Sequence, residues 1–276
     1  MPLTVRDHIT LDNINTWPVA IRRLLTTEEG GIRSFLREER RFDRLAESDV
    51  MIRNSRPTNP HQDSWDRTVE AVRELVRAQP IIGFHCARLA RGEIDDVRAN
   101  GLRPLSPCLT SQRIEKLAYQ GLISPAAARA LMERNVASAT NREGMIWFFH
   151  ALSTLRDESG LYRLFRYWGG EAVYSYHEKD PGVCNELRRI GTPCIVVAAL
   201  DPSEVGIIGR LEERMVRVWM DRRKAGVHSR DCDTYVKRRV RVIDVIIRAD
   251  TLFEELTVCS NWHHSIDAVD EKPVVG

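Results

Sequence analysis

Apolar side chains at helical spacing dominate the first 79 residues of the chain. The stretch 63–78 is the clearest case, since its apolar positions fall on one helix face: Trp65, Val69, Val72 and Val76. The same spacing predicts helices over 19–25 and 28–46. Residues 53–62 hold two prolines and otherwise only polar or charged side chains, which indicates a loop. We therefore expect residues 1–79 to form a helical N-terminal region.

Beyond residue 79 the apolar runs become shorter and denser, as is typical of buried strands. Runs of this kind lie at 80–84, 102–106, 144–149, 193–200, 215–220 and 235–247, and the run 193–200 predicts a strand most strongly. Short helices are predicted between them, over 93–97 and within 110–135. Because helices and strands do not alternate regularly, the pattern favours an α+β fold with a split mixed or antiparallel sheet. This second region is expected over 80–260, followed by a polar tail, 261–276.

Composition narrows the class of protein further. The 276 residues are 43% hydrophobic and 29% charged, which fits a globular protein. The formal net charge of +2 argues against a nucleic-acid-binding surface that covers the whole molecule. Basic side chains do gather in three runs mixed with acidic ones, which form either solvated faces or a groove for an anionic ligand: 37–44, 210–224 and 237–241.

Absent motifs also restrict the function. No apolar run reaches 18 residues and the first residues lack the apolar core of a secretory signal, so we expect no membrane segment. The six cysteines are scattered, which favours a reducing compartment and a cytoplasmic location. The chain has no GxGxxG, P-loop, HExxH or GxSxG motif, so a Rossmann dinucleotide site is not expected.

Three short stretches carry residues that could perform chemistry. His85 follows the strand-like run 80–84, an aromatic run occupies 147–149, and Glu171 follows Trp168-Gly169-Gly170. Each also has an ordinary structural explanation: a histidine satisfied in the core, aromatic side chains that fill the core, and a glutamate that caps a helix or pairs with an arginine. The residues alone leave both explanations open.

In this chain order the three stretches resemble the His–aromatic–Glu type of ADP-ribosyltransferase, the group of diphtheria toxin and the poly-ADP-ribose polymerases. The first strand of that family reads Tyr-His-Gly-Thr, and this chain has Phe84-His85-Cys86-Ala87, without the Gly-Thr pair. The family's second strand resembles 144–149, with Trp147 in the place of a tyrosine. The resemblance covers roughly residues 80–250 and implies an ADP-ribosyltransferase-like split sheet.

The resemblance implies that NAD is the substrate and that ADP-ribose passes to a macromolecular acceptor, either protein or nucleic acid, as nicotinamide leaves. Glu171 would stabilise the oxocarbenium-like ribose, and His85 would bind the adenosine ribose. The residues implied in NAD binding are His85, Arg88, Trp147, Phe148, Trp168 and Gly170. Arg88 would contact the pyrophosphate, and Trp147 or Trp168 would stack on nicotinamide. Four other carboxylates compete with Glu171: Asp231, Asp233, Glu254 and Glu255.

Family membership would also imply a biological setting. Intracellular enzymes of this type act as toxins in toxin–antitoxin or phage-defence systems, and residues 1–79 would then contact the target, an antitoxin or another partner protein. The alternative is a catalytically inactive module of the same fold that binds nucleic acid or a protein partner. The missing Gly-Thr pair after His85 favours that alternative.

Cysteine and histidine spacing suggests two further sites. The pairs His228/Cys232 and Cys259/His263 have the local spacing of a structural Cys2His2 zinc site, although no C-x2-C pair is present. Cys86 adjoins His85, but neighbouring strand residues face opposite sides, so these two do not form a nucleophile–base dyad.

Overall fold

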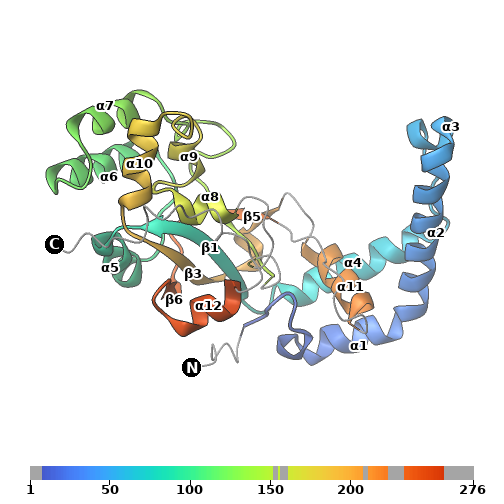
Figure 1. The fold of residues 1–276 in the computed structure, drawn as a ribbon. Coiled ribbons are helices and arrows are strands. Elements are labelled where there is room, and N and C mark those ends of the chain that lie inside the picture. The colour runs from blue at the N-terminus through green and yellow to red at the C-terminus, as the bar shows by residue number, and fades with distance from the viewer. Residues whose placement is uncertain (1–7, 152–154, 156–160, 208–210, 223–232, 258–276) are drawn as a thin grey trace. The chain divides into compact units, whose positions relative to one another are not determined.

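The computed structural model describes residues 8–151, 155, 161–207, 211–222 and 233–257, and these divide into two compact units. Unit 1 comprises residues 1–81, 201–203 and 207–232, and unit 2 comprises 82–200, 204–206 and 233–276. Figure 1 labels the helices and most of the strands of both. The helical unit therefore takes in a segment from late in the chain, in addition to the N-terminal region.

Unit 1 is built from helices. They are the short 3-10 turn Ile14–Thr16 and the helices α1 (Val19–Thr27), α2 (Glu29–Ser48), α3 (Val50–Asn54), α4 (Gln62–Val76) and α11 (Leu211–Asp221). The apolar face predicted for α4 is confirmed, because Trp65, Val69, Val72 and Val76 are all buried. Phe35 of α2 stacks on Trp65 with ring centroids 4.3 Å apart.

The strand predicted over 215–220 is wrong, since these residues belong to α11. Leu211, Met215 and Trp219 recur every four residues and are buried, which is the spacing of one helix face. The helix joins α4 through the ion pair between Arg73 Nε and the buried Glu212 carboxylate, 3.2 Å apart. The short apolar run resembled a strand because periodicity over so few residues does not separate the two structures.

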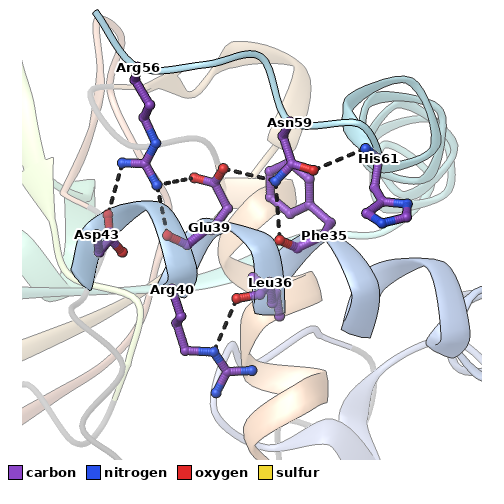
Figure 2. Close-up of polar contacts among 8 residues, drawn as sticks. All are labelled: Phe35, Leu36, Glu39, Arg40, Asp43, Arg56, Asn59 and His61. Carbon is purple, nitrogen blue, oxygen red and sulfur yellow. Dashed lines mark hydrogen bonds and ion pairs between the residues drawn. The ribbon is translucent and has the colours of Figure 1, made fainter. Parts of the chain in front are cut away.

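A polar network fixes the predicted loop against α2, as Figure 2 shows. The amide of buried Asn59 donates to the carbonyl of Phe35 at 3.2 Å and to Glu39 Oε1 at 2.9 Å. Arg56 donates to Glu39 and to Asp43, at 3.2 and 2.8 Å. The loop is thus ordered by contacts that its composition alone does not reveal.

Unit 2 contains two small antiparallel sheets with helices around them, an α+β arrangement, although the terminal strand residues Ile81 and Ile207 are counted in unit 1. One sheet has the order β1-β3-β6, formed by Ile81–Leu89, Thr192–Leu200 and Val242–Ile247. The other has the order β2-β5-β4, formed by Ile146–Phe148, Thr234–Val236 and Gly206–Ile207. The helices are α5 (Arg91–Asn100), α6 (Pro107–Tyr119), α7 (Pro125–Glu133), α8 (Leu161–Arg166), α9 (Glu171–Tyr174), α10 (Pro181–Arg189) and α12 (Thr251–Thr257).

Two contacts set the register of these sheets. Val196 of β3 lies opposite Val245 of β6, and Trp147 of β2 lies opposite Tyr235 of β5. A bridge between Phe84 and Phe149 joins β1 to the end of β2, with N–H···O distances of 2.7 and 2.9 Å. This bridge brings the histidine-bearing strand next to the aromatic strand.

Two other predictions of strands need correction. In the stretch 102–106 Leu102 forms an isolated bridge to Val240 and Leu105 makes main-chain hydrogen bonds with Gly144 and Met145, but no strand forms, because Ser106 caps α6, which begins at Pro107. The stretch 235–247 is divided between β5 and β6.

The second helix of 110–135 starts as its sequence predicts, with the Ser124 hydroxyl accepting from the Ala127 N–H at 3.1 Å and Pro125 in the first turn. No helix in the described part of the chain is long and apolar enough to span a membrane.

Candidate functional site

His85 lies in the middle of β1, where it is the one residue of this nine-residue strand that is partly exposed. Its Nδ1 is 2.9 Å from the main-chain carbonyl of Trp147 in β2. A carbonyl only accepts, so Nδ1 carries the proton and, in the neutral imidazole, Nε2 keeps its lone pair. Nε2 makes no hydrogen bond with any residue that the structure describes. The geometry therefore presents His85 as a fixed hydrogen-bond acceptor.

The surroundings of His85 keep its ring neutral. Burial lowers the pKa of this imidazole most strongly, and the cation of Arg113 lowers it further. The hydrogen bond to Trp147 opposes these effects without cancelling them. At neutral pH the acceptor at Nε2 is therefore preserved.

Of the three aromatic residues predicted to bind NAD, the two on β2 occupy different environments. Phe148 is buried, and its ring meets the His85 ring edge-on with centroids 6.0 Å apart. Trp147 is partly exposed and packs against Tyr235, with centroids 5.2 Å apart. Because neighbouring strand residues face opposite sides, the Trp147 ring points away from the side that Phe148 occupies. Phe148 supports His85 from the core, and a stacking role for Trp147 stays a prediction.

Trp168 belongs to a polar cluster with Glu93 and Arg113. The Trp168 ring is 0% exposed, and its Nε1 donates to Glu93 Oε2 at 2.8 Å. The other carboxylate oxygen, Oε1, accepts from Arg113 Nε at 2.7 Å, and the guanidinium carbon lies 4.7 Å from the Trp168 ring centroid. A ring that is buried and covered in this way holds Arg113 in place, so we do not assign it to nicotinamide stacking.

Glu93 is ionised within this cluster. Burial alone would raise its pKa, but the charge and hydrogen bond of Arg113, together with the N–H groups of Ala90 and Trp168, outweigh burial and lower it. The sequence pattern placed Glu93 only within the short helix predicted over 93–97, and Arg113 only within the helical stretch 110–135. Their pairing joins α5 to α6 over twenty residues, and no local pattern indicates it.

Glu171 is the first residue of the short helix α9. Gly169 and Gly170 have φ values of 90° and 67°, in the left-handed region that glycine tolerates, and this turn leads into α9. The Glu171 side chain is 51% exposed and pairs with Arg142, with Oε1 2.7 Å from Nη2. Gly170 thus sets the direction of the chain immediately before the predicted catalytic carboxylate.

Arg88 has a structural environment. Its side chain is buried, with Nε donating to the carbonyl of Ile190 at 2.8 Å and Nη1 to that of Phe165 at 3.1 Å. A guanidinium committed to main-chain carbonyls inside the core is poorly placed to bind a pyrophosphate. A pyrophosphate bound at this site would therefore have to be held by a basic residue other than Arg88, for which that role was predicted.

The remaining candidates are spread over unit 2 or lie outside the described residues. Asp233, Glu254 and Glu255 are exposed, the last two on α12. Asp231 and the predicted zinc ligands lie outside the described residues: His228, Cys232, Cys259 and His263. Among the residues that the structure describes, no three histidine, cysteine or acidic side chains group as a metal site.

Comparison with known proteins gives no match for this chain, whether among family models, curated proteins or solved structures. A function can therefore be inferred only from the side chains described above.

Proposed function

We propose that the protein is an NAD-dependent ADP-ribosyltransferase whose site lies in unit 2 around His85. The observation that carries this proposal is the hydrogen bond from His85 Nδ1 to the Trp147 carbonyl. It leaves Nε2 of the neutral ring of partly exposed His85 as an acceptor, which suits a sugar hydroxyl that donates. The order of a histidine strand beside an aromatic strand, joined at Phe84 and Phe149, gives further support.

The proposed reaction breaks the bond between the ribose C1′ and the nicotinamide nitrogen, and the electron pair leaves with nicotinamide. Positive charge then develops on the ribose, and a carboxylate stabilises this charge as it forms. Glu171 is our choice, because it is half exposed and its position is fixed by Arg142. A nucleophile of the acceptor then bonds to C1′ and releases its proton to solvent or a base.

The proposal extends to a biological role as a toxin or phage-defence effector in the cytoplasm. The acceptor would be a protein or a nucleic acid, and the helical unit 1 would contact the target, an antitoxin or another partner protein.

One observation favours an inactive module of the same type as a second candidate. Arg142 lies 2.7 Å from the Glu171 carboxylate and so neutralises much of its charge. In that case the chain would bind a nucleic acid or a protein partner. Nucleic-acid binding of this kind would weaken steeply with salt and would not respond to NAD.

The test is nicotinamide release from NAD by the purified protein, with and without cell lysate as a source of acceptor. We expect Glu171→Gln to lower the rate about a hundredfold, the usual effect of losing one transition-state contact. His85→Ala should also lower it. Glu178→Gln is the matched control, because it removes another ion-paired carboxylate of unit 2, 3.2 Å from Arg163.

Two other results would change the proposal. Activity that survives Glu171→Gln would keep the enzyme but move the carboxylate to Asp231, Asp233, Glu254 or Glu255. No nicotinamide release together with no NAD binding would reject the enzyme and favour the inactive module.

A further inference from the structure

We propose that Arg113 of α6 binds the diphosphate of the nucleotide substrate in the His85 site. This inference rests on the proposed function, since it names the residue that would hold the anionic part of NAD. It also replaces the pyrophosphate role predicted for Arg88.

The guanidinium of Arg113 is fixed before any ligand binds. Its Nε donates to Glu93 Oε1 at 2.7 Å, and the Trp168 ring covers one of its faces. Glu93 is held in turn by the Trp168 Nε1 and by the Ala90 N–H, both 2.8 Å from Oε2. An arginine held on one edge and one face loses little side-chain entropy when a ligand binds.

The other edge of the guanidinium is available. The two terminal amino groups of Arg113 make no hydrogen bond with any residue that the structure describes. The side chain is 23% exposed, so solvent reaches it. Two adjacent amino groups in a rigid plane match the geometry of phosphate oxygens, to which arginine donates in pairs. Arg88, by contrast, uses its donors on buried carbonyls.

The position of Arg113 also fits a ligand that His85 binds. Its partner Glu93 accepts from the N–H of Ala90, the residue that directly follows β1, so Arg113 is tied to the end of the strand that carries His85. Lys116, one helical turn further along α6, adds positive charge, with its Nζ beside Gly92 in α5. Lys116 is exposed and has no ion pair with the described residues. The strand that presents a hydroxyl acceptor at His85 is thus joined to an arginine that can donate to phosphate oxygens, and a sugar diphosphate would use both.

The experiment measures dissociation constants for NAD, ADP and adenosine with the full-length protein. The variants are Arg113→Gln, which removes the cation, and Arg113→Lys, which keeps the charge but loses the paired donors. We expect Arg113→Gln to weaken NAD and ADP about tenfold to a hundredfold, as for a lost charge-assisted hydrogen bond. Arg113→Lys should weaken both by a smaller factor. Adenosine, which has no phosphate, should bind both variants as it binds the wild type.

Arg163→Gln is the matched control, because it removes another ion-paired arginine of unit 2 and should leave all three constants unchanged. Should Arg113→Gln fail to fold, Arg113→Lys alone provides the comparison of ADP with adenosine. Equal weakening of ADP and adenosine, or no change in either, would overturn the assignment of the diphosphate.

The outcome for Arg113 can be separated from that for the proposed function. NAD binding and nicotinamide release that do not depend on Arg113 would reject this inference and keep the enzyme. ADP binding that depends on Arg113, without any nicotinamide release, would support the diphosphate site and reject the transferase. A wild-type protein that binds neither NAD nor ADP would overturn both.

Discussion

Acidification should destabilise unit 2 through His150, a buried histidine that the sequence did not single out. His150 is 0% exposed, and its Nδ1 lies 2.7 Å from the Ile82 carbonyl. Its Nε2 lies 2.7 Å from the Thr234 hydroxyl, which therefore donates to it. The residue connects β1 to β5, so it holds the two sheets together beside the strand that carries His85.

The size of this loss of stability follows from the pKa of His150. Burial lowers the pKa of His150 to about 4, from an ordinary value of 6.5. Between these values the unfolded chain binds a proton that the folded chain does not, so the free energy of unfolding falls as the pH falls. Each pKa unit corresponds to about 1.4 kcal/mol, so lowering the pH from 7.5 to 5.0 should cost about 2 kcal/mol. The stability that depends on a neutral His150 is fully present above pH 6.5 and is lost progressively as the pH falls toward 4.

The assay is guanidinium unfolding at pH 7.5 and 5.0, for the wild type and His150→Asn. The asparagine amide can still donate to Ile82 but cannot be protonated in this range. Between pH 7.5 and 5.0 the free energy of unfolding of His150→Asn should therefore fall by about 2 kcal/mol less than that of the wild type. Thr234→Val is the comparison that keeps His150 and should keep the steep pH dependence. Equal losses of stability in the wild type and His150→Asn would refute the reasoning.

Two further predictions concern the turn before Glu171 and the Trp168 cluster. Gly170→Ala should destabilise the protein by about 1–2 kcal/mol, because φ at this residue is positive although a Cβ would meet no atom within 4 Å. Gly30→Ala in α2, also in open space but with helical φ, should instead stabilise it by about 0.5–1 kcal/mol, and melting temperatures compare the pair. Trp168→Phe removes the donor to Glu93 Oε2 and should cost about 1 kcal/mol in thermal unfolding while weakening ADP binding; an unchanged melting temperature would contradict the role given to Nε1.

Local periodicity predicted the elements that repeat a pattern over several turns or bury one face. Helix α4 and strand β3 occupy the expected stretches, and α7 begins at its Ser-Pro signal. It failed over short apolar runs, as in α11, where six residues fit either structure. Whether such a run becomes a helix or a strand depends on the surface of the fold against which it packs, and a short stretch of sequence holds no information on that surface.

At the candidate site, too, local sequence predicted some features and long-range contacts determined the others. The sequence indicated His85, but its tautomer depends on a carbonyl 62 residues away in another strand. Arg88 was chosen for its closeness to His85 in the chain, yet the fold directs it to core carbonyls. Arg113 was not chosen, because only the pairing of α5 with α6 shows that its partner is Glu93. Sequence order predicts which residue types are present, and long-range hydrogen bonds decide which of their atoms are free.

The unbonded atoms of His85 and Arg113 restrict the chemical groups of a possible ligand more than the His–aromatic–Glu order does. A neutral Nε2 at His85 can accept one hydrogen bond but cannot bind an anion, because it has no proton to donate. The terminal amino groups of Arg113, which bond to none of the described residues, can only donate, and Glu93 balances their charge through Nε alone. A ligand that satisfies both must offer a hydroxyl and an oxyanion, which excludes purely apolar or cationic molecules. NAD carries both groups within one molecule, and for this reason the comparison of ADP with adenosine tests the site more directly than activity alone.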